Sequence, residues 1–254
     1  LNDGDVVTAT EDVNIAATES YEYTFGQALT VTPGDQNLKV WVSKVNGGDD
    51  DDLTDNEQIK VLHVATESVQ RLPLYEEFTS ATCGPCANFN ANTLDPLMIA
   101  NEGKYTMIKY QMNWPSPGDP YYTEEGGVRR SYYGVNAVPS FWAEGENPSS
   151  VNQALFDNLY EVPALMEITA EHTISEDHNI TVKAKINSFF NAENLILHTV
   201  VVENKTTENV MNNGETEFFY VMMKMMPDAN GQEVDLVAGE EQTVTLSADL
   251  SGTH

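Results

Sequence analysis

The sequence is poor in basic residues, in cysteine and in long apolar runs, and each shortage excludes a class of protein. Lysine and arginine total 12 against 40 aspartates and glutamates, so the formal net charge is −28. A chain of this charge repels nucleic acid and anionic membranes, and we expect neither as a partner. No window approaches about 18 consecutive apolar residues, so no transmembrane segment is expected. A signal-peptide pattern is also missing from this chain.

The two cysteines both lie in one short motif, Cys83-Gly84-Pro85-Cys86. An apolar strand pattern over residues 72–78 precedes it and a helical pattern over 87–94 follows it, which predicts that Cys83 lies at a helix N-terminus. There, unpaired N–H groups and the helix dipole lower a thiol pKa from about 8.5 toward roughly 3.5 to 7.5. Cys83 is therefore the candidate nucleophile. Cys86 lies about one helical turn further on, where it could resolve a mixed disulfide formed on Cys83.

A second stretch, Tyr133-Gly134-Val135-Asn136-Ala137-Val138-Pro139-Ser140-Phe141, reads as a loop, an X-Pro bond and a strand. Together with the CxxC motif it resembles the thioredoxin fold, in which a cis-proline in such a segment packs against the redox pair. The resemblance implies a cis peptide before Pro139. It also implies that the backbone of Val138 binds an extended substrate strand.

The same resemblance assigns the remaining roles at the site. Glu77, six residues before Cys83, matches the buried acid that accepts a proton in thioredoxin. The sequence departs from the family in having Glu where Asp is usual and Thr82 where Trp is usual. The candidate catalytic residues are Cys83, Cys86 and Glu77. The candidate substrate-binding residues are Val138, Pro139, Gly84, Pro85 and Trp114.

Trp114 belongs to a loop rich in proline and aromatic residues over 114–122. Proline stiffens such a loop, and aromatic side chains line many recognition surfaces. The alternative is that these side chains only pack the loop onto the domain, because an exposed aromatic and a packed one look the same in a sequence.

The pattern of strands and helices predicts an α/β thioredoxin-like domain flanked by all-β immunoglobulin-like sandwich domains. We expect a partial immunoglobulin-like sandwich over residues 1–66 and the thioredoxin-like domain over 67–164. A C-terminal β-sandwich that need not be complete is expected over 165–254. The strands predicted outside the central domain cover 6–10, 21–25, 28–32, 38–45, 59–65, 166–173, 179–186, 195–203, 218–226 and 242–246.

Two groups of side chains could be mistaken for metal or binding sites. The loop between the last two strands of the first domain carries Asp49, Asp50, Asp51, Asp52 and Asp55. Clustered carboxylates can bind Ca²⁺, but the spacing fits no EF-hand, and a solvated hairpin tip is the favoured interpretation. The methionines of residues 222–226 are interpreted as core filling. The five histidines show no metal-ligand spacing, so no metal site is assigned to them.

The order of motifs along the chain is similar to that of secreted or outer-membrane-associated surface proteins of Bacteroidetes type. In that family a thioredoxin-like domain precedes a β-sandwich, and an immunoglobulin-like module can stand in front. The resemblance covers residues 70–254. It implies a secreted or cell-surface protein whose signal peptide is not in this chain, which begins with Leu1 rather than methionine.

Two functions from different classes remain open. The first is a thiol–disulfide oxidoreductase that acts on protein or peptide thiols and disulfides through a redox-active Cys83–Cys86 disulfide. It needs no cofactor, but it needs an electron donor that the chain does not encode. The second is an extracellular binding or adhesion protein in which the CxxC forms an ordinary stabilising disulfide. Zinc binding by the CxxC is disfavoured because no second ligand pair accompanies it.

Overall fold

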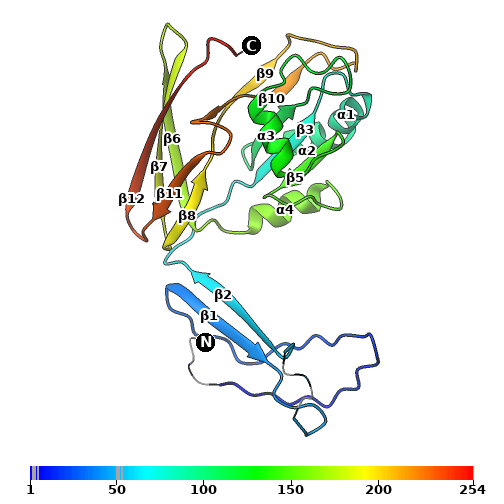
Figure 1. Ribbon diagram of the computed structural model, residues 1–254, viewed down its shortest axis with the longest axis vertical. Coiled ribbons are helices and arrows are strands. Elements are labelled where there is room, and N and C mark those ends of the chain that lie inside the picture. The colour runs from blue at the N-terminus through cyan, green and yellow to red at the C-terminus, as the bar shows by residue number, and fades with distance from the viewer. Residues whose placement is uncertain (2–3, 5, 50–51, 53, 254) are drawn as a thin grey trace. The chain divides into compact units, whose positions relative to one another are not determined.

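The computed structural model describes the chain except for residues 2–3, 5, 50–51, 53 and 254 (Figure 1). The described chain divides into two compact units, Leu1–Thr66 and Glu67–His254. The first boundary lies where the sequence pattern changes from strands to the mixed α/β order.

The first unit contains one two-stranded antiparallel sheet of β1 (Gly34–Trp41) and β2 (Glu57–Val64). The runs expected as strands at 6–10, 21–25 and 28–32 form no strand among the described residues. A strand forms where another backbone accepts and donates its hydrogen bonds, and among the described residues of this unit the strand pairing is that of β1 with β2, beside one isolated bridge between Val45 and Gly48. The described residues therefore do not display the expected sandwich.

The second unit is built around a five-stranded sheet in the order β5-β3-β4-β10-β9. The strands β3 and β4 are parallel to each other, β5 is antiparallel to β3, β10 is parallel to β4, and β9 is antiparallel to β10. Their bounds are β3 (Leu74–Thr79), β4 (Thr106–Gln111), β5 (Ser140–Ala143), β9 (Thr199–Thr206) and β10 (Phe218–Met226).

Helices follow β3, β4 and β5 in the alternating order that the sequence predicts. They are α1 (Gly84–Phe89), α2 (Asp95–Ala100), α3 (Glu124–Tyr132) and α4 (Gln153–Glu161). A π-helical turn, Asn90–Leu94, joins α1 to α2 and ends where Pro96 begins the next helical turn. The helical pattern predicted over 87–94 is thus present, and its irregular turn lies just before Pro96. Among the described residues, no helix has the length and apolarity needed to cross a membrane.

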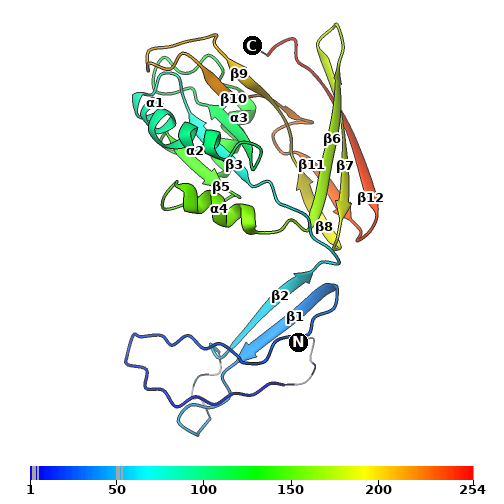
Figure 2. The same ribbon diagram turned by 180° about the vertical axis from the view of Figure 1, so that it is seen from behind.

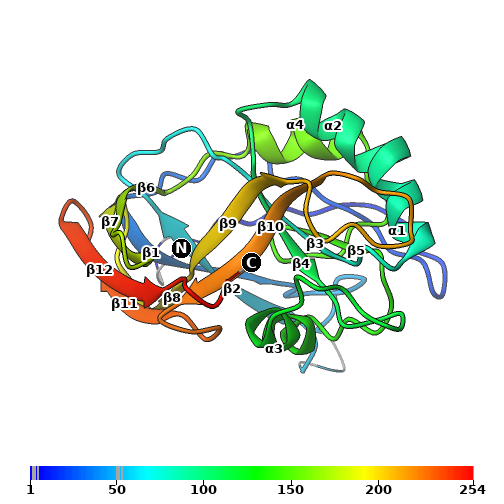
Figure 3. The same ribbon diagram turned by 90° about the horizontal axis from the view of Figure 1, so that it is seen from above.

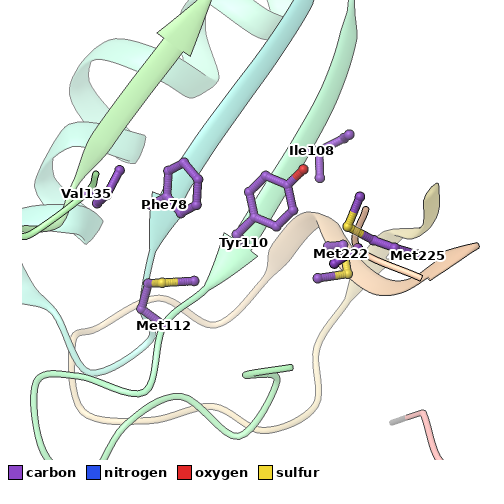
Figure 4. Packing of buried hydrophobic residues seen from close by; sticks show 8 residues of the cluster. Phe78, Ile108, Tyr110, Met112, Val135, Met222 and Met225 are labelled. Atoms are coloured by element: carbon purple, nitrogen blue, oxygen red, sulfur yellow. The ribbon is translucent and has the colours of Figure 1, made fainter. Parts of the chain in front are cut away.

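The helices cover both faces of this sheet, with α1, α2 and α4 on one face and α3 on the other (Figure 3). Successive strand residues point to opposite faces, so Tyr75 packs with Leu94 and Phe156 under the first set of helices. Phe78 and Tyr110 belong to the cluster on the other face (Figure 4).

The methionine-rich strand β10 contributes to three clusters of buried side chains. Met222 and Met225 pack against Tyr110 and Phe78 (Figure 4). Met223 and Met226 are buried in two further clusters. The interpretation of these methionines as core residues is confirmed.

The remaining strands form two smaller sheets beside the five-stranded one (Figure 2). One has the order β12-β7-β6 and the other pairs β11 with β8. Their side chains meet in a cluster of Ile186, Val234 and Leu236, which joins the two sheets. The bounds are β6 (Met166–Ile174), β7 (Asn179–Ser188), β8 (Ala192–Leu197), β11 (Gln232–Leu236) and β12 (Glu241–Asp249).

The second boundary that the sequence suggests, at residue 164, does not separate two sets of strands in the structure. The single strand expected over 195–203 is two strands, β8 and β9, which join different sheets. β9 and β10 complete the sheet that carries β3, so residues 67–254 form one compact unit. Alternating apolar and polar residues indicate a half-buried strand, but they do not indicate which strand will pair with it.

Candidate functional site

The two cysteines form a disulfide at the start of α1. Cys83 is the N-cap residue, and its Sγ accepts a hydrogen bond of 3.1 Å from the backbone N–H of Cys86. Cys83 is 3% exposed to solvent, whereas Cys86 is not exposed. Gly84 and Pro85 between them are exposed at the surface. Of the two cysteines, Cys83 is thus the one nearer to the surface.

The loop before the cysteines is fixed by the proline-rich segment that follows β4. The hydroxyl of Thr82 donates to the carbonyl of Pro115 over 2.7 Å. The backbone N–H of Ala81 donates to the carboxylate of Asp119 over 2.5 Å. Thr82, which stands where the thioredoxin family usually has tryptophan, thus ties the two loops together. These bonds hold the chain that presents Cys83 in one position.

Val138 and Pro139 lie against the disulfide, as the resemblance implied. Their peptide bond is cis, so this expectation is confirmed. The carbonyl oxygen of Val138 lies 3.7 Å from the Sγ of Cys83. In the disulfide this is a contact, and a thiol at Cys83 could donate its S–H to the same oxygen.

A groove of about 310 Å³ opens beside Pro139. It lies between α1, the start of β5 and the segment that leads to α4, and no charged residue lines it. Its walls include Phe89, Thr93, Pro139, Phe141, Asn147 and Val151. The volume is at the lower end of the range for small-molecule sites, and its neutral walls suit an uncharged side chain.

Glu77 lies on β3, on the face of the sheet that α1, α2 and α4 cover, and it is fully buried. Its carboxylate forms an ion pair with Lys109 of β4, whose Nζ lies 3.0 Å from Oε2. Burial raises the pKa of the Glu77 carboxyl above its ordinary value, and the Lys109 ammonium offsets part of this rise. The pKa of Lys109 is also raised, because the attraction of the neighbouring carboxylates outweighs the cost of burying its charge. A buried acid whose pKa is raised in this way is a candidate proton acceptor.

Lys109 is a site residue that the sequence patterns did not single out. The signal was present, since this lysine interrupts the apolar strand pattern over 105–112. Glu77 and Lys109 are paired in register in the parallel strands β3 and β4, so they point to the same face. Only that register places the two charges together.

A second buried acid, Glu76, points to the opposite face of the sheet. Its carboxylate accepts hydrogen bonds from the hydroxyl of Tyr110 over 2.8 Å and from Arg129 over 3.1 Å. The hydroxyl of Tyr133 also donates to it. All the partners are protein groups of the core and of α3, so this network fixes α3 to the sheet.

Trp114 is half-buried, and its ring packs against the core cluster that contains Phe78. The guanidinium of Arg130 lies 4.8 Å from the ring centre. This placement agrees with the alternative of loop packing. The carbonyl of the neighbouring Pro115 accepts the hydrogen bond from Thr82, next to Cys83.

The aspartate-rich loop is described only in part. Asp50 and Asp51 lie outside the described residues. Asp52 is exposed and accepts hydrogen bonds from the backbone and hydroxyl of Thr54, which lower the pKa of its carboxyl. Within the described part of the chain, no group of three or more metal-binding side chains is found.

Comparison with known proteins gives a likeness of fold. No family model matches the sequence, and no curated protein matches it. Among solved structures, this fold is similar to that of HBP35 of Porphyromonas gingivalis. The two are 17% identical, with a TM-score of 0.54 over 74% of this chain and 67% of that one. A structural-genomics protein of Agrobacterium tumefaciens gives a TM-score of 0.48 at 19% identity, over 72% of this chain and 80% of that one. At such identities the likeness to HBP35 concerns the fold alone.

Proposed function

We propose that the protein is a thiol–disulfide oxidoreductase of the thioredoxin-like type, acting on protein or peptide disulfides. The observation that carries the proposal is the position of Cys83. It caps α1, keeps the exposed side of the disulfide and faces the carbonyl of Val138. The likeness of fold to HBP35, together with the acidic composition, supports a secreted or surface-attached member of this class.

The chemistry begins with the protein in its dithiol form. The Cys83 thiolate attacks one sulfur of the substrate disulfide, forming a mixed disulfide and releasing the other sulfur as a thiolate. Cys86 then loses its proton and attacks the sulfur of Cys83. The Cys83–Cys86 disulfide forms and the substrate leaves as a dithiol, having gained two electrons. An external dithiol must reduce the protein again, and with an excess of substrate dithiol the same steps run in reverse.

Each residue has a role that follows from its position. The N–H of Cys86 points at the Sγ of Cys83 and stabilises negative charge on it. The resemblance to thioredoxin assigns Glu77 as the acceptor of the Cys86 proton, and its carboxyl is buried with a raised pKa. The backbone around Val138 and Pro139 and the neutral groove beside it hold the segment of substrate that carries the disulfide.

The test is the reduction of insulin disulfides with dithiothreitol as electron source. We expect catalysis by the wild-type protein and background rates for C83S. The reduction potential of the Cys83–Cys86 pair should lie in the range of exchange enzymes, from about −270 to −120 mV. Background rates for the wild type would contradict the proposal.

A second candidate is a binding protein with a structural disulfide, and the small exposure of Cys83 favours it. In that case the potential should lie below about −300 mV. Turnover of insulin should then be absent in the wild type, and C83S should lower stability without changing any exchange activity.

A further inference from the structure

The turn between β9 and β10 reaches the loop that carries the redox pair, although more than a hundred residues separate them in sequence. Figures 1 and 2 both show this connection passing beside the start of α1. The side-chain amide of Asn213 donates to the carbonyl of Ser80 over 3.1 Å. The backbone N–H of Asn213 donates to the carbonyl of Ala81 over 3.2 Å. The turn thus holds the segment just before Cys83.

Glu215 connects this turn to the buried ion pair. One carboxylate oxygen accepts from the side-chain amide of Asn90 over 2.7 Å, and the other accepts from the amide of Asn213. The amide oxygen of Asn90 in turn accepts from the Nζ of Lys109 over 3.1 Å. Lys109 completes the chain by its ion pair with Glu77.

The chemistry of the end groups fixes the orientation of Asn90. A lysine ammonium can only donate, and an ionised carboxylate can only accept. The amide oxygen of Asn90 must therefore face Lys109 and its NH₂ must face Glu215. Asn90 is 4% exposed, so water cannot easily replace either partner.

The space beside this chain of hydrogen bonds is lined mainly by polar side chains. A cavity of about 10 Å³, large enough for one water molecule, lies among residues that include Lys109, Glu215 and Asp95. Among the described residues, two buried oxygens on its walls, Thr79 Oγ1 and Gln111 Oε1, have no hydrogen-bond partner. The path from Glu215 to Lys109 runs through the buried side chain of Asn90.

We propose that Glu215 is a positioning residue of the redox site. Through Asn90 it orients Lys109 against Glu77, and through Asn213 it holds the loop that presents Cys83. This inference rests on the proposed function. It deepens that function by adding a residue of the β9–β10 turn to the groups that position the redox site. Three charged groups act on Glu77, namely Lys109 of β4, Asp95 of α2 and Glu215, and the last two oppose the first.

The experiment compares E215Q with the matched variant E217Q. Both change the net charge by one, and Glu217 also borders the cavity. Its carboxylate, however, pairs with Lys205 at the surface, 2.7 Å away, and not with Asn90. Reduced proteins are titrated, with the Glu77 carboxyl followed by carbon-13 NMR and the alkylation rate of Cys83 by iodoacetamide.

In E215Q we expect the titration midpoint of Glu77 to fall by about half a pH unit or more, because a nearby negative charge is removed. The alkylation profile of Cys83 should shift as well, and E215D should restore part of both shifts. E217Q should match the wild type. Identical Glu77 midpoints in wild type, E215Q and E217Q would overturn the proposal.

The two hypotheses fail in different ways. The Glu77 titration reports the coupling whether or not the protein turns over a disulfide. Absence of insulin reduction by the wild type would overturn the proposed function alone, and an unshifted Glu77 in an active E215Q would overturn the positioning role alone.

Discussion

The Sγ of Cys83 and the carbonyl oxygen of Val138 lie 3.7 Å apart, although 55 residues separate them in the chain. The first residue caps a helix after β3, and the second precedes β5, the strand that pairs with β3. Strand pairing therefore brings the two loops to the same end of the sheet. In the proposed reaction the substrate sulfur lies beside this pair.

The exposure of the two cysteine residues predicts which of them forms the mixed disulfide with a substrate. Because Cys83 keeps the small exposed surface and Cys86 has none, C86S should form a stable mixed disulfide with a peptide or protein disulfide, whereas C83S should not. Mass spectrometry of the non-reduced products measures this directly. Equal trapping by both variants would contradict the assigned order of attack.

The raised pKa of Glu77 predicts a pH dependence of stability. The folded protein binds this proton more tightly than the unfolded chain does, so the contribution is fully present below the ordinary carboxyl pKa of about 4.3 and is lost as pH rises through the folded value. E77Q lacks this titration. Wild type should therefore lose free energy of unfolding relative to E77Q as pH rises from the ordinary carboxyl pKa toward the folded value.

Urea denaturation of both proteins at a series of pH values in that range measures the difference, and the surface variant E217Q serves as control for net charge. Lys109 does not disturb the comparison, because its raised pKa lies far above the range. A wild type that gains stability relative to E77Q with rising pH would show that the Lys109 ion pair outweighs burial.

The network around Glu76 should be structural. E76A leaves the guanidinium of Arg129 buried without this carboxylate, and loss of one member of a buried pair costs about 3 to 5 kcal/mol. Y133F removes one hydroxyl donor and should cost about 1 kcal/mol. Chemical denaturation gives both values. The reduction potential of the cysteines should not move in Y133F, whose hydroxyl lies on the sheet face opposite Glu77.

The two compact units predict independent folding. A chain of residues 67–254 contains the five-stranded sheet with β9 and β10, so it should keep the near-ultraviolet circular dichroism and the insulin-reducing rate of the whole chain. A chain that ends at residue 164 lacks β9 and β10 and should not fold. Stable folding of residues 67–164 would restore the domain boundary that the sequence suggested.

Much of the central unit could be predicted because its signals are local. The CxxC motif, the apolar run before it and the helical pattern after it place Cys83 at a helix start without knowledge of any partner. The strand over 140–143 and the methionine strand over 218–226 were likewise legible from short patterns. In the first unit the same kind of signal failed, since strand-like runs at 6–10 and 21–25 form no strand.

The sequence by itself determined which residues can do sulfur chemistry, because a cysteine pair one helical turn apart and a preceding acid are properties of neighbouring positions. Only the tertiary structure decided what surrounds them. It paired Lys109 with Glu77 and placed β9 and β10 in the same sheet as β3. It also brought Glu215 within hydrogen-bond distance of Asn90. These contacts depend on strand pairing between distant segments, and side-chain alternation along one strand carries no information about its partner.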